Sequence, residues 1–218
     1  MGLVYQGMPP DLLALVQRLT GARTFIETGT NLGGSAAFAA ETFQRVWTIE
    51  AQPHLHTQAK ARLDKLENVE AILGNSETGL ARMIVTVDGP AVCWLDAHWS
   101  GGETAGELNE CPVLDEIRSI DTAPVEHVLL IDDARLFLQP PPRPHKIEHW
   151  PSIAELADVA RARWPQAYLA VIDDVIVRVP GNLRGPFCES LRDKLDSTAA
   201  APYFKKRRKS LRRRLFGA

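Results

Sequence analysis

The stretch Thr24-Phe-Ile-Glu-Thr-Gly-Thr-Asn-Leu-Gly-Gly-Ser35 decides the fold of this chain. It predicts an apolar strand, then a turn that contains glycines, and then the start of a helix. Glycine lets the backbone bend sharply and approach a ligand closely. The first turn of a helix presents free N–H groups to polar ligand atoms. This stretch therefore predicts a strand–turn–helix unit that binds a ligand.

The second predicted strand ends in a carboxylate that can bind a ligand. A second strand is predicted at residues 46–49, and it ends in Glu50. An acid at the tip of the second strand can accept hydrogen bonds from both hydroxyls of a ribose. Residues 24–50 therefore predict a pocket for a nucleoside-containing cofactor.

The rest of the chain continues this alternation of strands and helices. Strands are predicted at residues 24–27, 46–49, 69–73, 91–95 and 127–131, and helices at 11–19, 34–43, 54–66, from 76 to about 85, 110–120, 152–163 and 186–195. Two β-branched runs within residues 168–179 meet at Asp173-Asp174, which predicts a hairpin. Alternating units imply an α/β fold with a parallel sheet, to which the hairpin adds an antiparallel strand. We expect one domain at residues 1–200, with an accessory N-terminal helix within residues 1–20.

Length and composition favour an ordinary globular protein. The 218 residues are 45% hydrophobic and 24% charged. No apolar run reaches the roughly 20 residues of a membrane span, and the first residues lack the pattern of a secretory signal. The cysteines Cys93, Cys111 and Cys188 form no zinc-type pair and suggest a reducing compartment. We therefore expect a cytoplasmic protein.

The C-terminal residues 201–218 form a basic tail. Residues 205–214 hold eight of the 25 Lys and Arg and no acid, which leaves 17 basic and 27 acidic residues elsewhere, a charge of −10. The tail is interpreted either as a solubilising segment or as an attachment to an anionic membrane surface, which would place the protein peripherally at the inner membrane. Nucleic acid is not expected as a partner, because the tail lacks interleaved aromatic residues and the body is acidic.

Acidic residues follow four of the five predicted parallel strands. They are Glu27, Glu50, Asp96 and the pair Asp132-Asp133. Ligands of open α/β sheets bind beyond the carboxyl ends of the strands. Clustered carboxylates repel one another, and a cationic ligand or a metal would relieve the repulsion.

These features resemble the class I S-adenosylmethionine-dependent methyltransferases over about residues 20–180. Glu27-Thr-Gly-Thr-Asn-Leu-Gly33 resembles the family's motif Glu/Asp-x-Gly-x-x-x-Gly, Glu50 matches its ribose-binding acid, and residues 75–76 lie where it contacts adenine. The hairpin resembles the family's reversed seventh strand, which implies a Rossmann-like seven-stranded sheet of order 3-2-1-4-5-7-6. The resemblance implies that S-adenosylmethionine is held by Glu27, Thr28, Gly29, Thr30, Asn31, Gly33, Ser35, Glu50, Asn75, Ser76 and Asp96.

A narrower resemblance concerns Asp96 with Asp132 and Asp133. It is to the metal-dependent O-methyltransferases, including those that act on macrolide sugars and catechols, which bind Mg²⁺ with acids after the fourth and fifth strands. Oxygen ligands of this kind suit Mg²⁺, and a metal-bound hydroxyl loses its proton more readily. Alternatively, Asp132 and Asp133 shape the mouth of the site without a metal.

Candidate catalytic and acceptor-binding residues follow the same strand ends. His98 is the candidate base; it could instead orient Asp96, which is a rival base. His127 is expected to be structural. Trp99, Glu107, Arg135 and His145 are candidate substrate contacts. A structural role explains the first three equally well, and surface exposure is the favoured alternative for His145. Residues 139–145 are rich in proline and predict a surface loop or partial lid.

The resemblance implies an O-methyltransferase, dependent on Mg²⁺, that acts on a hydroxyl of a sugar or glycoside. Two alternatives stay open. One is a metal-independent methyltransferase for a small phenol, amine or carboxylate, and the other is a cofactor-binding interaction module without turnover. Accessory N-terminal helices of similar enzymes form dimer interfaces, so a homodimer is a further expectation.

Overall fold

The computed structural model describes residues 7–99, 101, 106 and 109–197. The chain divides into two compact units, Met1–Gly181 and Asn182–Ala218. The first unit holds the sheet and every candidate site residue, while the described part of the second holds the helix α8 (Arg184–Ser197). The basic tail at residues 201–218, for which membrane attachment was one interpretation, lies outside the described residues.

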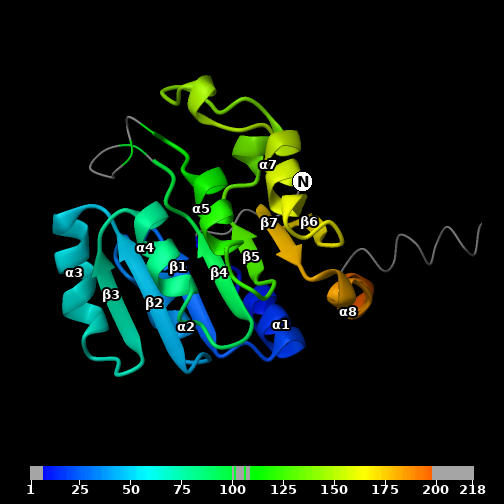
Figure 1. Ribbon diagram of the computed structural model, residues 1–218, viewed down its shortest axis with the longest axis horizontal. Helices are drawn as coiled ribbons and strands as arrows, with labels where there is room; N and C mark the ends of the chain where they lie inside the picture. Colours follow the sequence, from blue (N-terminus) through cyan, green and yellow to red (C-terminus); the bar gives the residue numbers. More distant parts are fainter. Residues whose placement is uncertain (1–6, 100, 102–105, 107–108, 198–218) are drawn as a thin grey trace, which may run out of the picture. The chain divides into compact units, whose positions relative to one another are not determined.

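The first unit is built on one mixed sheet (Figure 1). Its seven strands are ordered β3-β2-β1-β4-β5-β7-β6, as the resemblance implied. β7 runs antiparallel to β5 and β6, and the other strand pairs are parallel. The strands are β1 (Thr24–Thr28), β2 (Arg45–Glu50), β3 (Val69–Leu73), β4 (Ala91–Leu95), β5 (Val128–Ile131), β6 (Tyr168–Ile172) and β7 (Val175–Val179).

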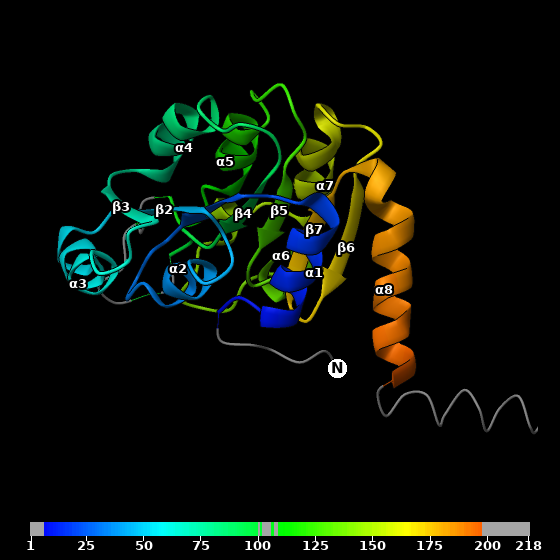
Figure 2. The same ribbon diagram turned by 90° about the horizontal axis from the view of Figure 1, so that it is seen from below.

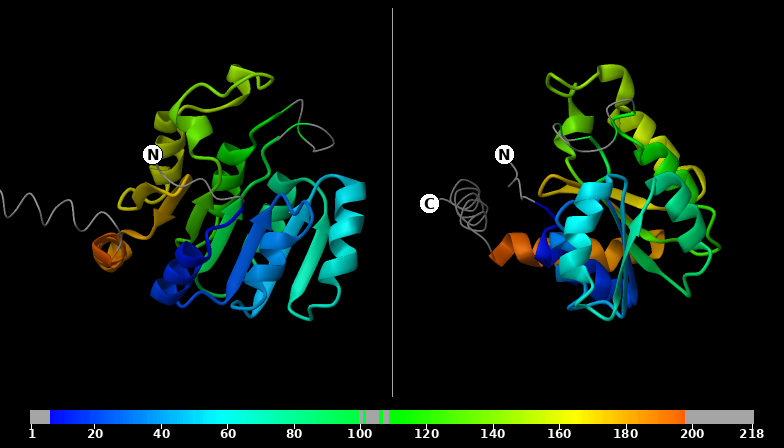
Figure 3. Two further views of the ribbon diagram at one scale, coloured as in Figure 1. Left: turned by 180° about the vertical axis from the view of Figure 1, so that it is seen from behind. Right: turned by 90° about the vertical axis from the view of Figure 1, so that its left-hand side faces the viewer.

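Helices cover both faces of this sheet (Figures 2 and 3). On one face lie α1 (Pro10–Thr20), α2 (Gly34–Ala39) and α3 (Pro53–Leu63). On the other lie α4 (Ser76–Ile84), α5 (Val113–Ile120) and α7 (Ile153–Ala162). The short helix α6 (Arg135–Leu138) follows β5, and 3₁₀ turns occur at Ile147–His149 and Gly181–Leu183. No helix of the described residues has the length and apolarity to cross a bilayer.

Both faces of the inner strands are buried, which explains their continuous apolar sequences. All residues of β1, β4 and β7 are buried. The one basic side chain among them is Arg178, whose guanidinium donates to both oxygens of Asp121 at 2.7 and 2.8 Å. Next to this ion pair, His127 Nδ1 accepts a hydrogen bond of 3.0 Å from the N–H of Ala91. His127 is therefore a structural histidine, as predicted.

Local sequence signals set several element ends. Ser152 and Glu155 form a capping box at the start of α7. The turn between β6 and β7 has positive φ at both Asp173 and Asp174, the geometry of a tight hairpin. The prediction of a helix from residue 110 is wrong at its start, because α5 begins at Val113. Glu110 instead lies in a loop, where residues far along the chain bind its carboxylate.

The register of the sheet brings the acidic strand ends together. Thr28 pairs with Leu95, and Leu95 pairs with Ile131. Asp96 directly follows Leu95, and Asp132 directly follows Ile131, so the two aspartates lie at the same edge of the sheet. The backbone N–H of Asp96 donates to the carbonyl of Thr28 at 3.1 Å, which ties the loop after β4 to the loop after β1.

Candidate functional site

A cavity of about 380 Å³ opens beyond the carboxyl ends of the strands. Six of the predicted cofactor contacts line it: Gly29, Asn31, Glu50, Asn75, Ser76 and Asp96. His98, Gly106 and Asn109 line it as well. Of the other predicted contacts, Glu27, Thr28 and Thr30 are buried, Gly33 is the N-cap of α2, and Ser35 lies in the first turn of this helix. The cavity therefore joins the predicted cofactor residues to the candidate base.

Glu50 is fixed by two backbone groups. Its Oε2 accepts from the N–H of Asn31 and its Oε1 accepts from the N–H of Gln52, each at 2.9 Å. Asn31 has a φ of 48°, a left-handed conformation that turns its N–H toward Glu50. Each carboxylate oxygen keeps a free lone pair, so Glu50 can also accept from a ligand's hydroxyls.

The glycine at position 29 is required by close packing. Gly29 has a φ of 82°, and a Cβ built there would lie 2.2 Å from the carbonyl oxygen of Asp96. Any side chain would push the loop after β1 away from the loop after β4. The contact between these two loops thus explains why the motif has a glycine at position 29.

Glu27 is a buried carboxyl below this turn, 1% exposed. It accepts a hydrogen bond of 2.6 Å from the Thr48 hydroxyl. Burial raises the pKa of Glu27 to about 8; the hydrogen bonds of Thr48 and Ser35 oppose this, and the charges of Asp96 and Glu50 add to it. A cationic ligand in the cavity would stabilise the ionised form of Glu27.

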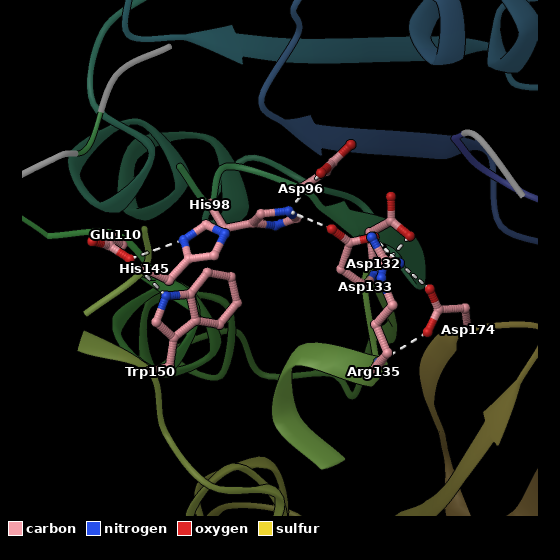
Figure 4. A network of polar contacts seen from close by, with 9 residues as sticks. All are labelled: Asp96, His98, Glu110, Asp132, Asp133, Arg135, His145, Trp150 and Asp174. Atoms are coloured by element: carbon pink, nitrogen blue, oxygen red, sulfur yellow. Dashed lines mark hydrogen bonds and ion pairs between the residues drawn. The ribbon is translucent and has the colours of Figure 1, made fainter. Parts of the chain in front are cut away.

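His98 links two of the strand-end aspartates (Figure 4). Its Nε2 lies 3.0 Å from Oδ2 of Asp133, and its Nδ1 lies 3.6 Å from Oδ1 of Asp96. The His98 side chain is only 8% exposed. Burial acts to lower the pKa of His98, but the hydrogen bond with Asp133 and the charges of Asp96, Asp133 and Asp132 outweigh it and raise that pKa.

The pKa values of the three neighbouring aspartates shift in opposite directions. Burial raises the pKa of Asp96 to about 7 and that of Asp132 to about 6, and nearby aspartates add to both shifts. Burial also acts to raise the pKa of Asp133, but His98 and Arg135 outweigh it and lower that pKa. Asp133 is therefore the carboxylate that stays ionised, and it is the one that holds His98.

Arg135 connects this group to the hairpin. Its guanidinium lies 2.5 Å from Oδ1 of Asp133 and also contacts the carboxylate of Asp174, while its backbone N–H donates to Asp174 at 2.9 Å. Asp133 itself has a φ of 57°, a left-handed conformation that is uncommon for residues other than glycine. Arg135, a candidate substrate contact, thus forms ion pairs with two carboxylates of the chain itself, those of Asp133 and Asp174.

The predicted magnesium site is not formed by this arrangement. Both oxygens of Asp133 are engaged, one by His98 and one by Arg135, and the His98 ring lies between Asp133 and Asp96. Within the described ranges, no three His, Cys, Asp or Glu side chains are arranged to hold a metal ion. The types of ligand suit Mg²⁺, but their positions do not fit it as they stand.

A second group of polar contacts is centred on Glu110. Sequence reasoning named His145 as a candidate substrate contact but did not predict its pairing with Glu110. The Glu110 carboxylate accepts from the Trp150 indole N–H at 2.9 Å and from the Lys146 backbone N–H at 3.1 Å, and it lies 3.0 Å from His145 Nδ1. Trp150 in turn packs against the His98 ring, with centroids 5.5 Å apart. The one available signal was the cluster of His and Trp at residues 145–150.

The predicted acceptor residues are brought together in part. Trp99 and His145 stack edge to face with ring centroids 5.6 Å apart. His98 lies beside them through its contact with Trp150, whereas Arg135 contacts Asp133 on the other side of His98 (Figure 4). Glu107 lies outside the described residues. The acceptor side of His98 therefore includes the rings of Trp99, His145 and Trp150.

Glu116 is a further buried acid that sequence reasoning did not single out. It lies on α5 and is fully enclosed, with 1% exposure. Burial raises the pKa of Glu116 to about 7, against hydrogen bonds from Ser76 and Thr28 that lower it. Glu116 thus joins α5 to two residues that were predicted to contact the cofactor.

Comparisons with known proteins agree with this architecture. No known family profile and no curated protein matches the sequence. Many solved structures are similar. Among them are a putative methyltransferase of Streptococcus mutans with S-adenosylhomocysteine (12% identity, 79% of this chain and 99% of that one, TM-score 0.50) and the methyltransferase PaMTH1 of Podospora anserina, also with S-adenosylhomocysteine (16%, 78% and 74%, 0.53). A putative caffeoyl-CoA O-methyltransferase of Staphylococcus aureus is similar as well (16%, 81% and 84%, 0.52). The chain therefore has the fold of the class I S-adenosylmethionine-dependent methyltransferases.

Proposed function

We propose that this protein transfers a methyl group from S-adenosylmethionine to a hydroxyl of a sugar or glycoside, with His98 as the general base. The observation that carries the proposal is the position of His98, which lines the cavity of the predicted cofactor residues and is held there by Asp133. Base and cofactor pocket then share one cavity, as a methyl transfer requires.

The cavity fits S-adenosylmethionine in its chemistry. Glu50 would hold the ribose hydroxyls, and Asn75 and Ser76 would border the adenine. Glu27 and Asp96 would place negative charge near a cationic ligand, and the close approach of Gly29 to Asp96 leaves the loop free of side-chain bulk. The cofactor, when bound, supplies a methyl group activated by a sulfonium.

His98 suits the removal of a proton from a hydroxyl. Because Asp133 stays ionised, it accepts a hydrogen bond from the Nε2–H of His98 and leaves Nδ1 as the basic nitrogen. Nδ1 lies on the side of Asp96, which lines the cavity. A hydroxyl at that position can give its proton to Nδ1 while its oxygen attacks the methyl carbon. Asp133 then stabilises the imidazolium that forms.

No metal step is included in this proposal. Magnesium was expected from Asp96, Asp132 and Asp133, but binding it there would require Asp133 to release His98 and Arg135. The mechanism above uses Asp133 to hold the base instead. The two schemes make opposite predictions for chelation, which are given in the Discussion.

The sugar preference rests on the acceptor side of His98. A half-buried Trp99 and the nearby His145 offer a ring face with a polar group beside it. Pyranosides have apolar C–H faces that pack on aromatic rings and hydroxyls that bind polar side chains. A phenol or a small amine is the alternative acceptor, since it would also pack on a ring.

A methyl-transfer screen tests the proposal. Purified protein is incubated with S-adenosylmethionine carrying a radiolabelled methyl group and with panels of glycosides, catechols and amines. We expect label in a glycoside, and its loss in His98→Gln while binding of S-adenosylhomocysteine is kept. Transfer only to amines or phenols would contradict the sugar assignment. Binding of the cofactor without transfer to any acceptor in the panels or in a cell extract would favour the interaction module.

The expectations about partners remain proposals. The basic residues 205–214 lie outside the described residues, so attraction to anionic membranes is still to be tested with vesicles. Leu12, Leu13, Leu15 and Val16 of α1 are buried within a single chain. A homodimer through α1 would therefore have to use the remaining, more polar surface of this helix.

A further inference from the structure

Glu110 is a buried carboxylate to which the proposed mechanism gives no task. It is 1% exposed and lies in the loop between β4 and α5. Its partners Trp150, Lys146 and His145 all come from one short segment, which lies 35 to 40 residues further along the chain. Burying a charge is costly unless hydrogen bonds satisfy it. A carboxylate so placed therefore joins two distant segments at a defined position.

The hydrogen bonds keep Glu110 ionised. Burial acts to raise the pKa of Glu110, but the hydrogen bonds of Trp150, of the Lys146 backbone and of His145 outweigh burial and lower that pKa. Hydrogen bonds to a charged acceptor are stronger than those between neutral groups. The charge of Glu110 thus strengthens the connection to residues 145–150.

The same residue also fixes Trp99. The backbone N–H of Trp99 donates to the backbone carbonyl of Glu110 at 2.7 Å. The His145 ring packs against both Trp99 and Trp150, with centroid distances of 5.6 and 5.2 Å. Main chain and side chain of Glu110 therefore set the positions of three rings, which we call the ring wall: Trp99, His145 and Trp150.

The ring wall meets the proposed base. Trp150 contacts the ring of His98 on the side away from Asp133, and its indole N–H points to Glu110 (Figure 4). His98 is thus held by an ion-paired carboxylate on one side and by a ring on the other. A shift of Trp150 would change both the space beside His98 and the orientation of its imidazole.

We propose that Glu110 is the positioning residue of the acceptor site, and that the ring wall it holds packs on a pyranoside acceptor beside His98 through its half-buried member Trp99. The assignment of the acceptor rests on the proposed function. The positioning of the ring wall does not, because it follows from contacts within the chain. Loss of Glu110 should therefore disturb the acceptor side and leave the cofactor side, with Glu50 and Asn31, unchanged.

Two variants and one control separate this role from a general loss of stability. Glu110→Gln keeps the shape and removes the charge, and Trp150→Phe keeps a ring and removes the indole N–H. Glu148→Gln is the matched control, since Glu148 lies in the same segment and is exposed. All three are first titrated with S-adenosylhomocysteine, whose affinity should be unchanged within about twofold for residues that do not line its pocket.

The first measurement needs no acceptor. Endoproteinase Lys-C cleaves after Lys146, and its rate at this bond reports opening of the segment. We expect cleavage to be about tenfold faster in Glu110→Gln, because a hydrogen bond to a charged group stabilises a closed state by about that factor. The NMR signal of the His98 Cε1–H group should move in both Glu110→Gln and Trp150→Phe. The control should match the wild type in both measurements.

The second measurement uses the glycoside that gives the most label in the screen. Glu110→Gln should raise the acceptor KM by about tenfold, in line with the loss of one charged hydrogen bond, and leave the KM for S-adenosylmethionine unchanged. If Glu110→Gln leaves both Lys-C cleavage and the His98 signal as in the wild type, the positioning role is wrong. If those two change while no glycoside is methylated by the wild type, the proposed function fails and the positioning role stands.

Discussion

Asp133 Oδ2 and His98 Nε2 lie 3.0 Å apart, although their residues follow different strands, β5 and β4. The pairing gives the adjacent residues Asp132 and Asp133 different states, since the pKa of Asp132 is raised and that of Asp133 is lowered. One aspartate of the pair therefore orients the proposed base, and the other remains a neighbouring carboxyl that is protonated more easily.

Replacing Asp133 should damage turnover more than binding. In Asp133→Asn the amide no longer fixes the tautomer of His98, and we expect kcat to fall by up to about 10⁴-fold, the loss known for the orienting carboxylate of a catalytic triad. Calorimetry with S-adenosylhomocysteine should give the wild-type affinity. An Asn variant with full activity would show that His98 does not depend on Asp133.

The pH dependence of the rate should follow His98. The base acts when deprotonated, so the rate rises as pH increases through the pKa of His98, which lies above its ordinary value of 6.5. In Asp133→Asn the hydrogen bond and a charge that raise this pKa are lost, and the midpoint should move to lower pH. Residual rates measured from pH 5 to 9 would reveal the shift, and an unchanged midpoint would count against His98 as the base.

Glu27 should make the protein less stable as pH rises. Its pKa is about 8 in the fold and 4.5 as the ordinary value, so the unfolded chain loses its proton first and the free energy of unfolding falls between these two pH values. Glu27→Gln lacks this loss. The free energy of unfolding of the variant minus that of the wild type should therefore rise between pH 4.5 and pH 8, by at most about 5 kcal/mol. Urea denaturation at several pH values measures it, with Glu67→Gln as an exposed control; a constant difference would refute the buried titration.

Removal of the Glu50 carboxylate should weaken cofactor binding. Glu50→Ala loses the proposed acceptors for the ribose hydroxyls and leaves the N–H groups of Asn31 and Gln52 without their partner. We expect the affinity for S-adenosylhomocysteine to fall by about 10- to 100-fold, the effect of losing hydrogen bonds to a charged group. Calorimetry beside the exposed control Glu41→Gln checks this. Equal affinities would place the ribose elsewhere.

Chelation distinguishes the two schemes for the strand-end aspartates. With Asp133 bound to His98 and Arg135, methyl transfer should continue at an unchanged rate in excess EDTA. The magnesium scheme instead requires that EDTA abolish transfer and that added Mg²⁺ restore it. Radiolabel transfer after dialysis against EDTA, with and without Mg²⁺, decides between them.

The sequence predicted those parts of the molecule that depend on local pattern. The positions of Glu50, Asp96 and Asp132 follow from strand ends, because parallel strands in register align their tips. The strand order was implied by the resemblance to the methyltransferases and not by local pattern. The role of Glu110 could not be seen in this way. Its helical propensity argued for α5, whereas its true partners lie in a segment whose path along the fold no local pattern specifies. The arrangement around Asp133 was missed for a similar reason, since a left-handed backbone at an aspartate has no signature in sequence.

The contact of Gly29 with the carbonyl of Asp96 has a consequence for redesign. The contact joins the loop after β1, which would bind the methyl donor, to the loop after β4, which carries His98. A side chain added at position 29 would therefore displace the loop of His98. Attempts to give this protein a new acceptor should therefore leave the donor loop as it is. Variation is better confined to Trp99 and His145 of the ring wall, because Trp150 also packs against the ring of His98.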